Sequence, residues 1–255
     1  MSGFTPDFAS ADVRVSPNFG PRRGIVQPDM VILHYTGMAS GEAAEGWLCN
    51  PASDVSSHYL VHEDGRIVQM VREADRAWHA GRGSWLGCHD INSCSIGIEI
   101  QNCGIDGGLP AFPDGQIEAV IRLVRDITAR RDIAAARILA HSDVAPGRKI
   151  DPGAQFPWRR LFEAGIGVMA APAAECDVLP SAPEAIGSHV EKLQYMLQSY
   201  GYGVEITGVY DAATRVVVGA FQLHFRQAQA DGIADAETVA IMQALLAGQH
   251  GLPAA

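Results

Sequence analysis

The sequence lacks any apolar run close to the roughly 18 residues that a membrane-spanning helix requires. Its first twenty residues also lack the basic start and following apolar stretch of a secretory leader. We therefore expect no transmembrane segment and a cytoplasmic location.

Basic side chains are also scarce. The chain has 19 lysines and arginines against 29 acidic residues, which gives a formal net charge of -10 and a pI near 5.3. Sequence-independent nucleic-acid binding depends mainly on lysine and arginine at phosphates, so we expect no nucleic-acid partner.

Cysteine is limited to five residues, with no C-x-x-C pair. This odd number and spacing do not match a structural zinc motif. We expect mostly buried free thiols, with one local disulfide within residues 88–103 as the alternative. Hydrophobic residues reach 47% and charged residues only 19%, which is ordinary globular composition and excludes a disordered chain.

Composition changes between residues 166 and 188, which are rich in alanine, proline and glycine and show no sustained periodicity. This pattern is typical of a linker. It predicts a larger domain over residues 1–165 and a smaller one over residues 189–255.

The larger domain alternates strand and helix patterns. Short apolar runs at residues 31–35, 96–100 and 138–141 predict strands, and Asp64-Gly65 predicts a hairpin turn. From Asp114 onward, apolar residues recur at helical spacing. These patterns predict an α/β domain in which helices flank a mixed central β-sheet.

The strand at residues 96–100 alternates isoleucine with Gly97 and Glu99. Successive side chains of a strand point to opposite faces, so Glu99 faces away from the isoleucines. A carboxylate on a central apolar strand is costly to bury without a partner or a task, and such a residue could serve as a general base. The alternative is an edge strand on which Glu99 is solvated.

The smaller domain contains an internal repeat. Residues 207–214 and 231–238 share a glycine, a β-branched residue, Asp-Ala and a threonine, offset by 24 positions. Asp211 and Asp235 are natural N-caps for the helices that follow. With an apolar stripe over residues 190–200, the pattern predicts a small all-α domain of three helices.

Two histidines, His34 and His141, end predicted strands, and Asp151 follows ten residues after the second. Two imidazoles and one carboxylate form a competent zinc site with a fourth position left for water. Spacing alone favours ordinary hydrogen-bonded histidines, because no compact motif such as H-E-x-x-H is present.

Lysine occurs only twice, at positions 149 and 192, against seventeen arginines. Two residues before Asp151, Lys149 could place an ammonium group beside a developing oxyanion. The alternative is a solvated cation in a loop.

Five ordered motifs resemble zinc-dependent N-acetylmuramoyl-L-alanine amidases of type 2, the family related to phage lysozyme-amidases and peptidoglycan recognition proteins. They are VILHYT at 31–36, SSHYLV at 56–61, AWHAG at 77–81, SIGIEIQN at 95–102 and HSDVAPGRKIDPG at 141–153. The resemblance covers about residues 31–158. It implies one zinc ion bound by His34, His141 and Asp151.

The same resemblance implies roles for other residues. Glu99 would be the catalytic base and Lys149 would stabilise the oxyanion. Trp78, His79 and Asn102 would line the substrate groove.

The smaller domain resembles the three-helix peptidoglycan-binding module of cell-wall hydrolases, on residues that include Gly208, Asp211, Phe221 and Asp235. Together the two resemblances imply an enzyme that cleaves the amide between N-acetylmuramic acid and L-alanine in peptidoglycan or muropeptides. The alternatives are a muropeptide receptor without catalysis and a wall-anchoring protein. A wall-binding module also makes the periplasm or cell wall the alternative location, and the sequence leaves the oligomeric state open.

Overall fold

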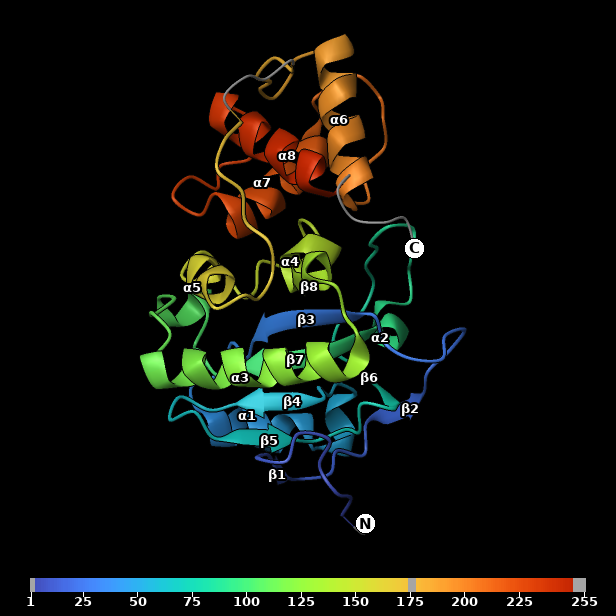
Figure 1. Ribbon diagram of the computed structural model, residues 1–255, viewed down its shortest axis with the longest axis vertical. Coiled ribbons are helices and arrows are strands. Elements are labelled where there is room, and N and C mark those ends of the chain that lie inside the picture. The colour runs from blue at the N-terminus through green and yellow to red at the C-terminus, as the bar shows by residue number, and fades with distance from the viewer. Residues whose placement is uncertain (1–2, 174–177, 250–255) are drawn as a thin grey trace. The chain divides into compact units, whose positions relative to one another are not determined.

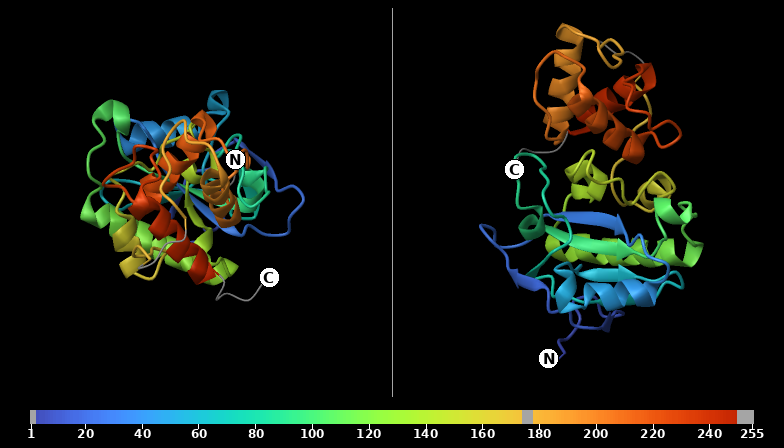
Figure 2. Two further views of the ribbon diagram at one scale, coloured as in Figure 1. Left: turned by 90° about the horizontal axis from the view of Figure 1, so that it is seen from above. Right: turned by 180° about the vertical axis from the view of Figure 1, so that it is seen from behind.

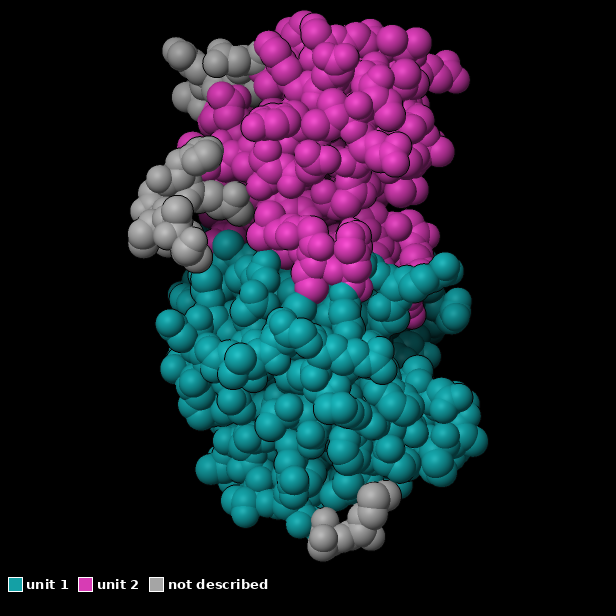
Figure 3. All heavy atoms as spheres, turned by 90° about the vertical axis from the view of Figure 1, so that its right-hand side faces the viewer, with its two compact units in different colours: residues 1–83, 90–141, 151–167 teal, residues 84–89, 142–150, 168–255 magenta. Residues whose placement is uncertain are grey.

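The computed structural model describes residues 3–173 and 178–249, in two compact units (Figure 3). Unit 1 comprises Met1–Gly83, Asp90–His141 and Asp151–Gly167, and unit 2 comprises Ser84–His89, Ser142–Ile150 and Val168–Ala255. The units differ from the division expected from composition, because two short segments that precede residue 165 belong to unit 2. Their contacts within that unit, described below, account for this difference.

Unit 1 is built on a mixed six-stranded sheet, as the sequence predicts (Figure 1). The strand order is β1-β5-β4-β7-β3-β8, in which β4 and β5 are antiparallel and the other neighbours are parallel. The strands of this sheet are β1 Asp12–Val13, β3 Met30–Tyr35, β4 Tyr59–Val61, β5 Ile67–Gln69, β7 Ser95–Ile100 and β8 Ile138–Ala140. A separate antiparallel pair consists of β2 Phe19–Pro21 and β6 Asp75–Ala77.

Helices cover both faces of the sheet. The long helix α3 (Asp114–Arg131) lies on one face and α1 (Gly41–Leu48) on the other (Figures 1 and 2). The predicted apolar stripe of α3 is buried, through Ile117, Val120, Ile121, Val124 and Ile127. Two shorter helices are α2 Ile91–Cys94 and α5 Trp158–Glu163. Among the described residues, none of the helices is long and apolar enough to cross a membrane.

In β7 the isoleucines and Glu99 face opposite sides of the sheet, as the sequence predicts. Its three isoleucines are fully buried, and β7 lies between β4 and β3 in the sheet. Glu99 pairs in register with Leu60, which packs against Ala44 and Leu48 of α1. Glu99 therefore projects from the face that carries α1, while the isoleucines face α3. The edge-strand alternative for Glu99 is wrong, because β7 has a hydrogen-bonded neighbour on each side.

The structure corrects one boundary. The sequence predicts that His141 ends a strand and is followed by a loop, but β8 ends at Ala140 and His141 begins the short helix α4 (His141–Val144). The reason is that the chain enters a helical turn directly at the sheet edge.

Unit 2 contains the three predicted helices, α6 Ser188–Tyr200, α7 Ala212–Phe225 and α8 Ala236–Gln249. Both predicted N-caps are confirmed. The Asp211 carboxylate accepts from the N–H of Thr214 at 2.8 Å, and the Asp235 carboxylate accepts from the N–H of Thr238 at 2.9 Å. We call α6–α8 the C-terminal module.

The cysteines of the described part of the chain carry no disulfide among Cys49, Cys88, Cys94 and Cys103. These four thiols are free, as expected, but the expectation that they are mostly buried is wrong, because each of them is only half-buried. Cys176 lies outside the described residues.

Candidate metal centre

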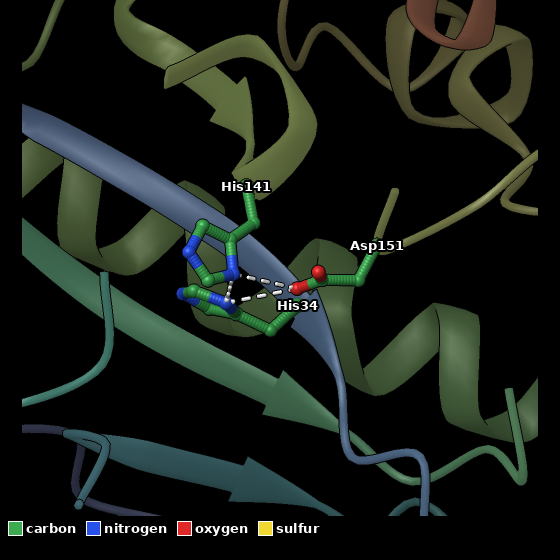
Figure 4. Close-up of side chains that lie close together, drawn as sticks. All are labelled: His34, His141 and Asp151. Carbon is green, nitrogen blue, oxygen red and sulfur yellow. Dashed lines mark hydrogen bonds and ion pairs between the residues drawn. The ribbon is translucent and has the colours of Figure 1, made fainter. Parts of the chain in front are cut away.

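His34, His141 and Asp151 come together at one edge of the sheet (Figure 4). His34 is the fifth residue of β3, and His141 directly follows β8. Because these strands are parallel neighbours paired Leu33 to Ala140, the two histidines leave the sheet side by side. The chain returns ten residues later, and Asp151 completes the group.

The three donor atoms form a small triangle. Nδ1 of His34 lies 2.9 Å from Nδ1 of His141 and 3.1 Å from Oδ2 of Asp151, and His141 Nδ1 is 2.9 Å from the same oxygen. All three residues are buried. A tetrahedral zinc with bonds of about 2.0 Å separates its ligands by roughly 3.3 Å, so the triangle has nearly the size that zinc requires.

A hydrogen bond fixes the tautomer of His141. Its Nε2 lies 2.9 Å from the carbonyl oxygen of Ala80, which can only accept. Nε2 therefore donates, and Nδ1 of the neutral imidazole is left with a bare lone pair. That lone pair faces His34 and Asp151.

A chain of hydrogen bonds fixes His34 in the same way. The Ser95 hydroxyl donates to the carbonyl of Ile91 at 2.6 Å, so its oxygen accepts from Nε2 of His79 at 3.2 Å. Nδ1 of His79 must then accept from Nε2 of His34 at 3.0 Å. Nδ1 of His34 consequently also carries a lone pair toward the centre.

The electrostatics of the centre favour a cation. Burial alone would raise the pKa of Asp151, but hydrogen bonds from His141 and His34, and the positive charge of these imidazoles when they are protonated, hold this pKa well below its usual range, so positive charge at this point stabilises the carboxylate. One ionised carboxylate oxygen and two imidazole lone pairs thus converge in a buried space, where they would repel one another without positive charge. Imidazole and carboxylate are common zinc ligands, so this donor set fits the single zinc ion that the sequence predicts.

Glu99 stands next to this group. On β7 it is the register partner of His34 on β3, so both side chains project from the same face of the sheet. It is half-buried. The structure therefore places a carboxylate beside the ligand set, and its role as catalytic base stays a prediction.

Two predicted groove residues use their polar atoms elsewhere. Both ring nitrogens of His79 are engaged, by His34 and Ser95. The amide of Asn102 donates to the carbonyl of Pro110 at 2.8 Å and accepts from the N–H of Gly104 at 2.9 Å. His79 thus orients His34, a candidate ligand, and Asn102 shapes the loop after β7. For both residues, contact with substrate stays a prediction.

Trp78 and Lys149 have different settings. Trp78 is half-buried, and its backbone N–H donates to the Ser56 hydroxyl at 2.9 Å. Lys149 belongs to unit 2, where its backbone N–H donates to the carbonyl of Ala145 at 3.0 Å. A groove contact by Trp78 and an oxyanion contact by Lys149 stay predictions.

The supporting residues Ser95 and Ala80 were not identified from the sequence. The sequence pattern could have identified Ser95, because alternation along β7 places Ser95 and Gly97 on the same face as Glu99. A Cβ atom at Gly97 would lie 2.4 Å from the His79 ring, so glycine is required there for His79 to reach His34. The Ala80 carbonyl has no signal, because any residue carries one.

His58, also close to the centre, is a packing residue. Its Nδ1 accepts from the N–H of Gly97 at 3.0 Å, and its Nε2 donates to the carbonyl of Asp75 at 3.1 Å. Burial, with a smaller contribution from Arg22, lowers the pKa of His58 to about 3. The ring is therefore neutral and belongs to the framework.

Sequence families match both parts of the chain. The profile described as N-acetylmuramoyl-L-alanine amidase matches residues 25–154, a range that contains the three candidate ligands and Glu99. A peptidoglycan binding domain profile matches residues 187–242, which span α6, α7 and part of α8.

Individual relatives agree. The N-acetylmuramoyl-L-alanine amidase AmiD of Escherichia coli is 38% identical over 231 residues, covering 85% of this chain and 82% of the relative. The 1,6-anhydro-N-acetylmuramyl-L-alanine amidase AmpD of Salmonella typhimurium is 32% identical over 163 residues, covering 57% and 85%.

Two solved structures are similar over nearly the whole chain. One is AmiD from E. coli in complex with anhydro-N-acetylmuramic acid-L-Ala-D-gamma-Glu-L-Lys, with a TM-score of 0.75, 37% identity and coverage of 92% of this chain and 93% of that one. The other is AmpDh3 from Pseudomonas aeruginosa in complex with anhydromuramic pentapeptide, with a TM-score of 0.74, 34% identity and coverage of 96% and 99%.

Proposed function

The chain belongs to the N-acetylmuramoyl-L-alanine amidase family, and from this premise we propose how its metal centre hydrolyses the amide between N-acetylmuramic acid and L-alanine. The observation that carries the proposal is the convergence of two imidazole lone pairs and one carboxylate beside Glu99. His34, His141 and Asp151 hold the zinc ion. When bound there, zinc supplies a Lewis acid that lowers the pKa of water and polarises a carbonyl.

The remaining chemistry belongs to side chains. Glu99 accepts the proton of the water that attacks the lactyl carbonyl carbon, and later returns it to the departing alanine nitrogen. The C–N bond breaks as that nitrogen is protonated, which yields a carboxylate on the sugar and a free amino group on the stem peptide. The ammonium of Lys149 adds positive charge for the developing oxyanion.

The substrate class follows from the relatives. The two complexes named above hold anhydromuramyl peptides, which supports a muropeptide as the substrate of this chain. The match of residues 187–242 to a peptidoglycan binding domain supports binding of the polymer by the C-terminal module.

Mass spectrometry of an anhydro-muropeptide incubated with the full chain tests the proposal. We expect release of the free stem peptide, abolished by a zinc chelator and restored by added zinc. Glu99→Gln, loaded with zinc, is the matched control and should release the stem peptide at least about 100-fold more slowly.

The rival functions give different results in the same assay. Binding of the muropeptide without cleavage, by protein that holds zinc, would indicate a receptor. Retention on isolated peptidoglycan that chelator leaves unchanged, with no product formed, would indicate a wall-anchoring protein.

A further inference from the structure

The loop between two of the candidate zinc ligands belongs to a different compact unit from the ligands themselves. His141 and Asp151 are in unit 1, but residues 142–150, the chain between them, are in unit 2 with α6–α8. This loop also carries Lys149. Contacts that hold residues 142–150 in place therefore affect, through the chain, the positions of His141 and Asp151 at the two ends of this loop.

The main anchor of the loop is Asp143, whose side chain is fully buried. One carboxylate oxygen accepts from the hydroxyl of Tyr202 at 2.6 Å, and the other from Nδ1 of His224 on α7 at 2.6 Å. A buried carboxylate is tolerated only with such partners, and losing one of them is costly. Asp143 is thus bound at both oxygens by the C-terminal module.

The two partners are themselves held rigidly. The His224 ring stacks on Phe225 with centroids 4.0 Å apart and planes inclined by 6°. Tyr202 is buried, with its ring 4.9 Å from that of Trp85 in an edge arrangement. Burial and the adjacent Asp143 raise the pKa of Tyr202 well above its usual range, so the hydroxyl keeps the proton that it donates.

Two further contacts hold the loop. The carbonyl of Val144 accepts from the N–H of Ser84 at 2.8 Å. A Cβ atom on Gly147, whose φ is +73°, would lie 3.2 Å from Val216 of α7, so the backbone approaches the helix closely there. The loop is therefore fixed at residues 143, 144 and 147, immediately before Lys149.

We propose that Tyr202 and His224, acting through Asp143, position the loop that joins two metal ligands, so that the C-terminal module influences those ligands through the chain at both ends of the loop. The inference rests on the zinc amidase function proposed above. It assigns the module a role that is independent of polymer binding, and it predicts that the module matters even for a small soluble substrate.

The test compares Tyr202→Phe and His224→Asn with Tyr210→Phe in the full chain. Tyr210 is the matched control, because its buried hydroxyl also donates one hydrogen bond in unit 2, to the carbonyl of Gly232 at 2.9 Å, but it does not bond the 142–150 loop. The readouts are the zinc dissociation constant from chelator competition, kcat and KM on a soluble anhydro-muropeptide, and the melting temperature.

We expect Tyr202→Phe and His224→Asn each to weaken zinc binding roughly tenfold, the lower end of what loss of an outer partner costs a metal site. Both should lower kcat more than they raise KM. Tyr210→Phe should lower the melting temperature and leave zinc affinity within about twofold.

Unchanged zinc affinity in both test variants would overturn the inference, as would an equal loss in Tyr210→Phe, which would indicate general destabilisation. In either case a wild-type chain that holds zinc and cleaves the muropeptide leaves the proposed function intact. A wild-type chain that binds no zinc overturns both.

Discussion

At the residue scale, the metal centre depends on tautomers. His34 and His141 each direct Nδ1 inward because Nε2 donates outward, to His79 and to the Ala80 carbonyl. The tautomers of the two histidines are therefore fixed by hydrogen-bond partners that do not themselves bind the metal, which is common for metal-binding histidines.

Glu99→Gln separates proton transfer from metal binding. The amide keeps the size of the side chain but cannot accept the water proton, so we expect kcat on a muropeptide to fall at least about 100-fold. Zinc content, measured by elemental analysis, should equal that of the wild type. Full turnover by the zinc-loaded variant would contradict the assignment of Glu99 as base.

His79→Ala distinguishes two roles for His79. If it positions His34, as the hydrogen bonds indicate, zinc affinity should fall roughly 10- to 100-fold. If it binds substrate, as the sequence resemblance implies, KM should rise while zinc affinity stays constant. Chelator competition and steady-state kinetics on the same preparation decide between them.

At the element scale, each turn of the internal repeat is held by a buried glutamine of the preceding helix, a residue outside the aligned segments 207–214 and 231–238. The buried amide of Gln194 on α6 donates to Thr207, Val209 and Thr214 and accepts from the N–H groups of Thr207 and Gly208. Gln222 on α7 binds the second loop in the same manner, through Gly232, Ile233 and Thr238. In each repeat one glutamine from the preceding helix satisfies the backbone of the turn.

Gln194→Ala should destabilise the C-terminal module by about 3 kcal/mol, because it leaves buried backbone donors without partners. Gln198→Ala is the matched control on the same helix, since Gln198 is exposed and donates only to the carbonyl of Val204 at 3.0 Å. We expect that control to lose less than about 1 kcal/mol in urea unfolding. Equal losses of unfolding free energy in the two variants would show that the buried amide of Gln194 does not stabilise the module more than an exposed amide does.

At the scale of the whole molecule, unit 1 is held together by a buried ion cluster between segments distant in sequence. Glu73, which follows β5, accepts from Tyr59 at 2.7 Å, from Arg130 at 2.7 and 2.8 Å and from Arg131 at 2.8 Å. The two arginines form the last turn of α3. The cluster thereby ties the end of α3 to β4 and to the segment that follows β5.

This cluster predicts how stability depends on pH. Burial alone would raise the pKa of Glu73, but the hydrogen bonds from Arg130, Tyr59 and Arg131 lower it from 4.5 to about 2. The folded state thus gains about 3 kcal/mol above pH 4.5 and loses it as the pH falls toward 2. Urea unfolding between pH 7 and 3 should show the greater part of this loss, and Glu73→Gln should show a shallower pH dependence. Parallel curves for the two proteins would refute the prediction.

Much of the fold was predictable because its signals are local. Alternation over residues 96–100 and helical periodicity from Asp114 depend on neighbours two to four residues apart, so the strand, the helix and the buried isoleucines were predicted correctly. The three candidate ligands were named only through the resemblance of ordered motifs, because spacing alone favoured ordinary histidines.

The sequence by itself therefore determined the central strands, the long helix α3, the three helices of the C-terminal module, the two N-caps of the repeat and the chemical types available for a zinc site. Only the tertiary structure decided that His34 and His141 meet, since this depends on β3 and β8 pairing across more than one hundred residues. It also decided which nitrogen faces the centre and that Asp143 is bound by Tyr202 and His224. Those outcomes depend on hydrogen bonds between distant segments, and no local pattern records which partners the fold will bring together.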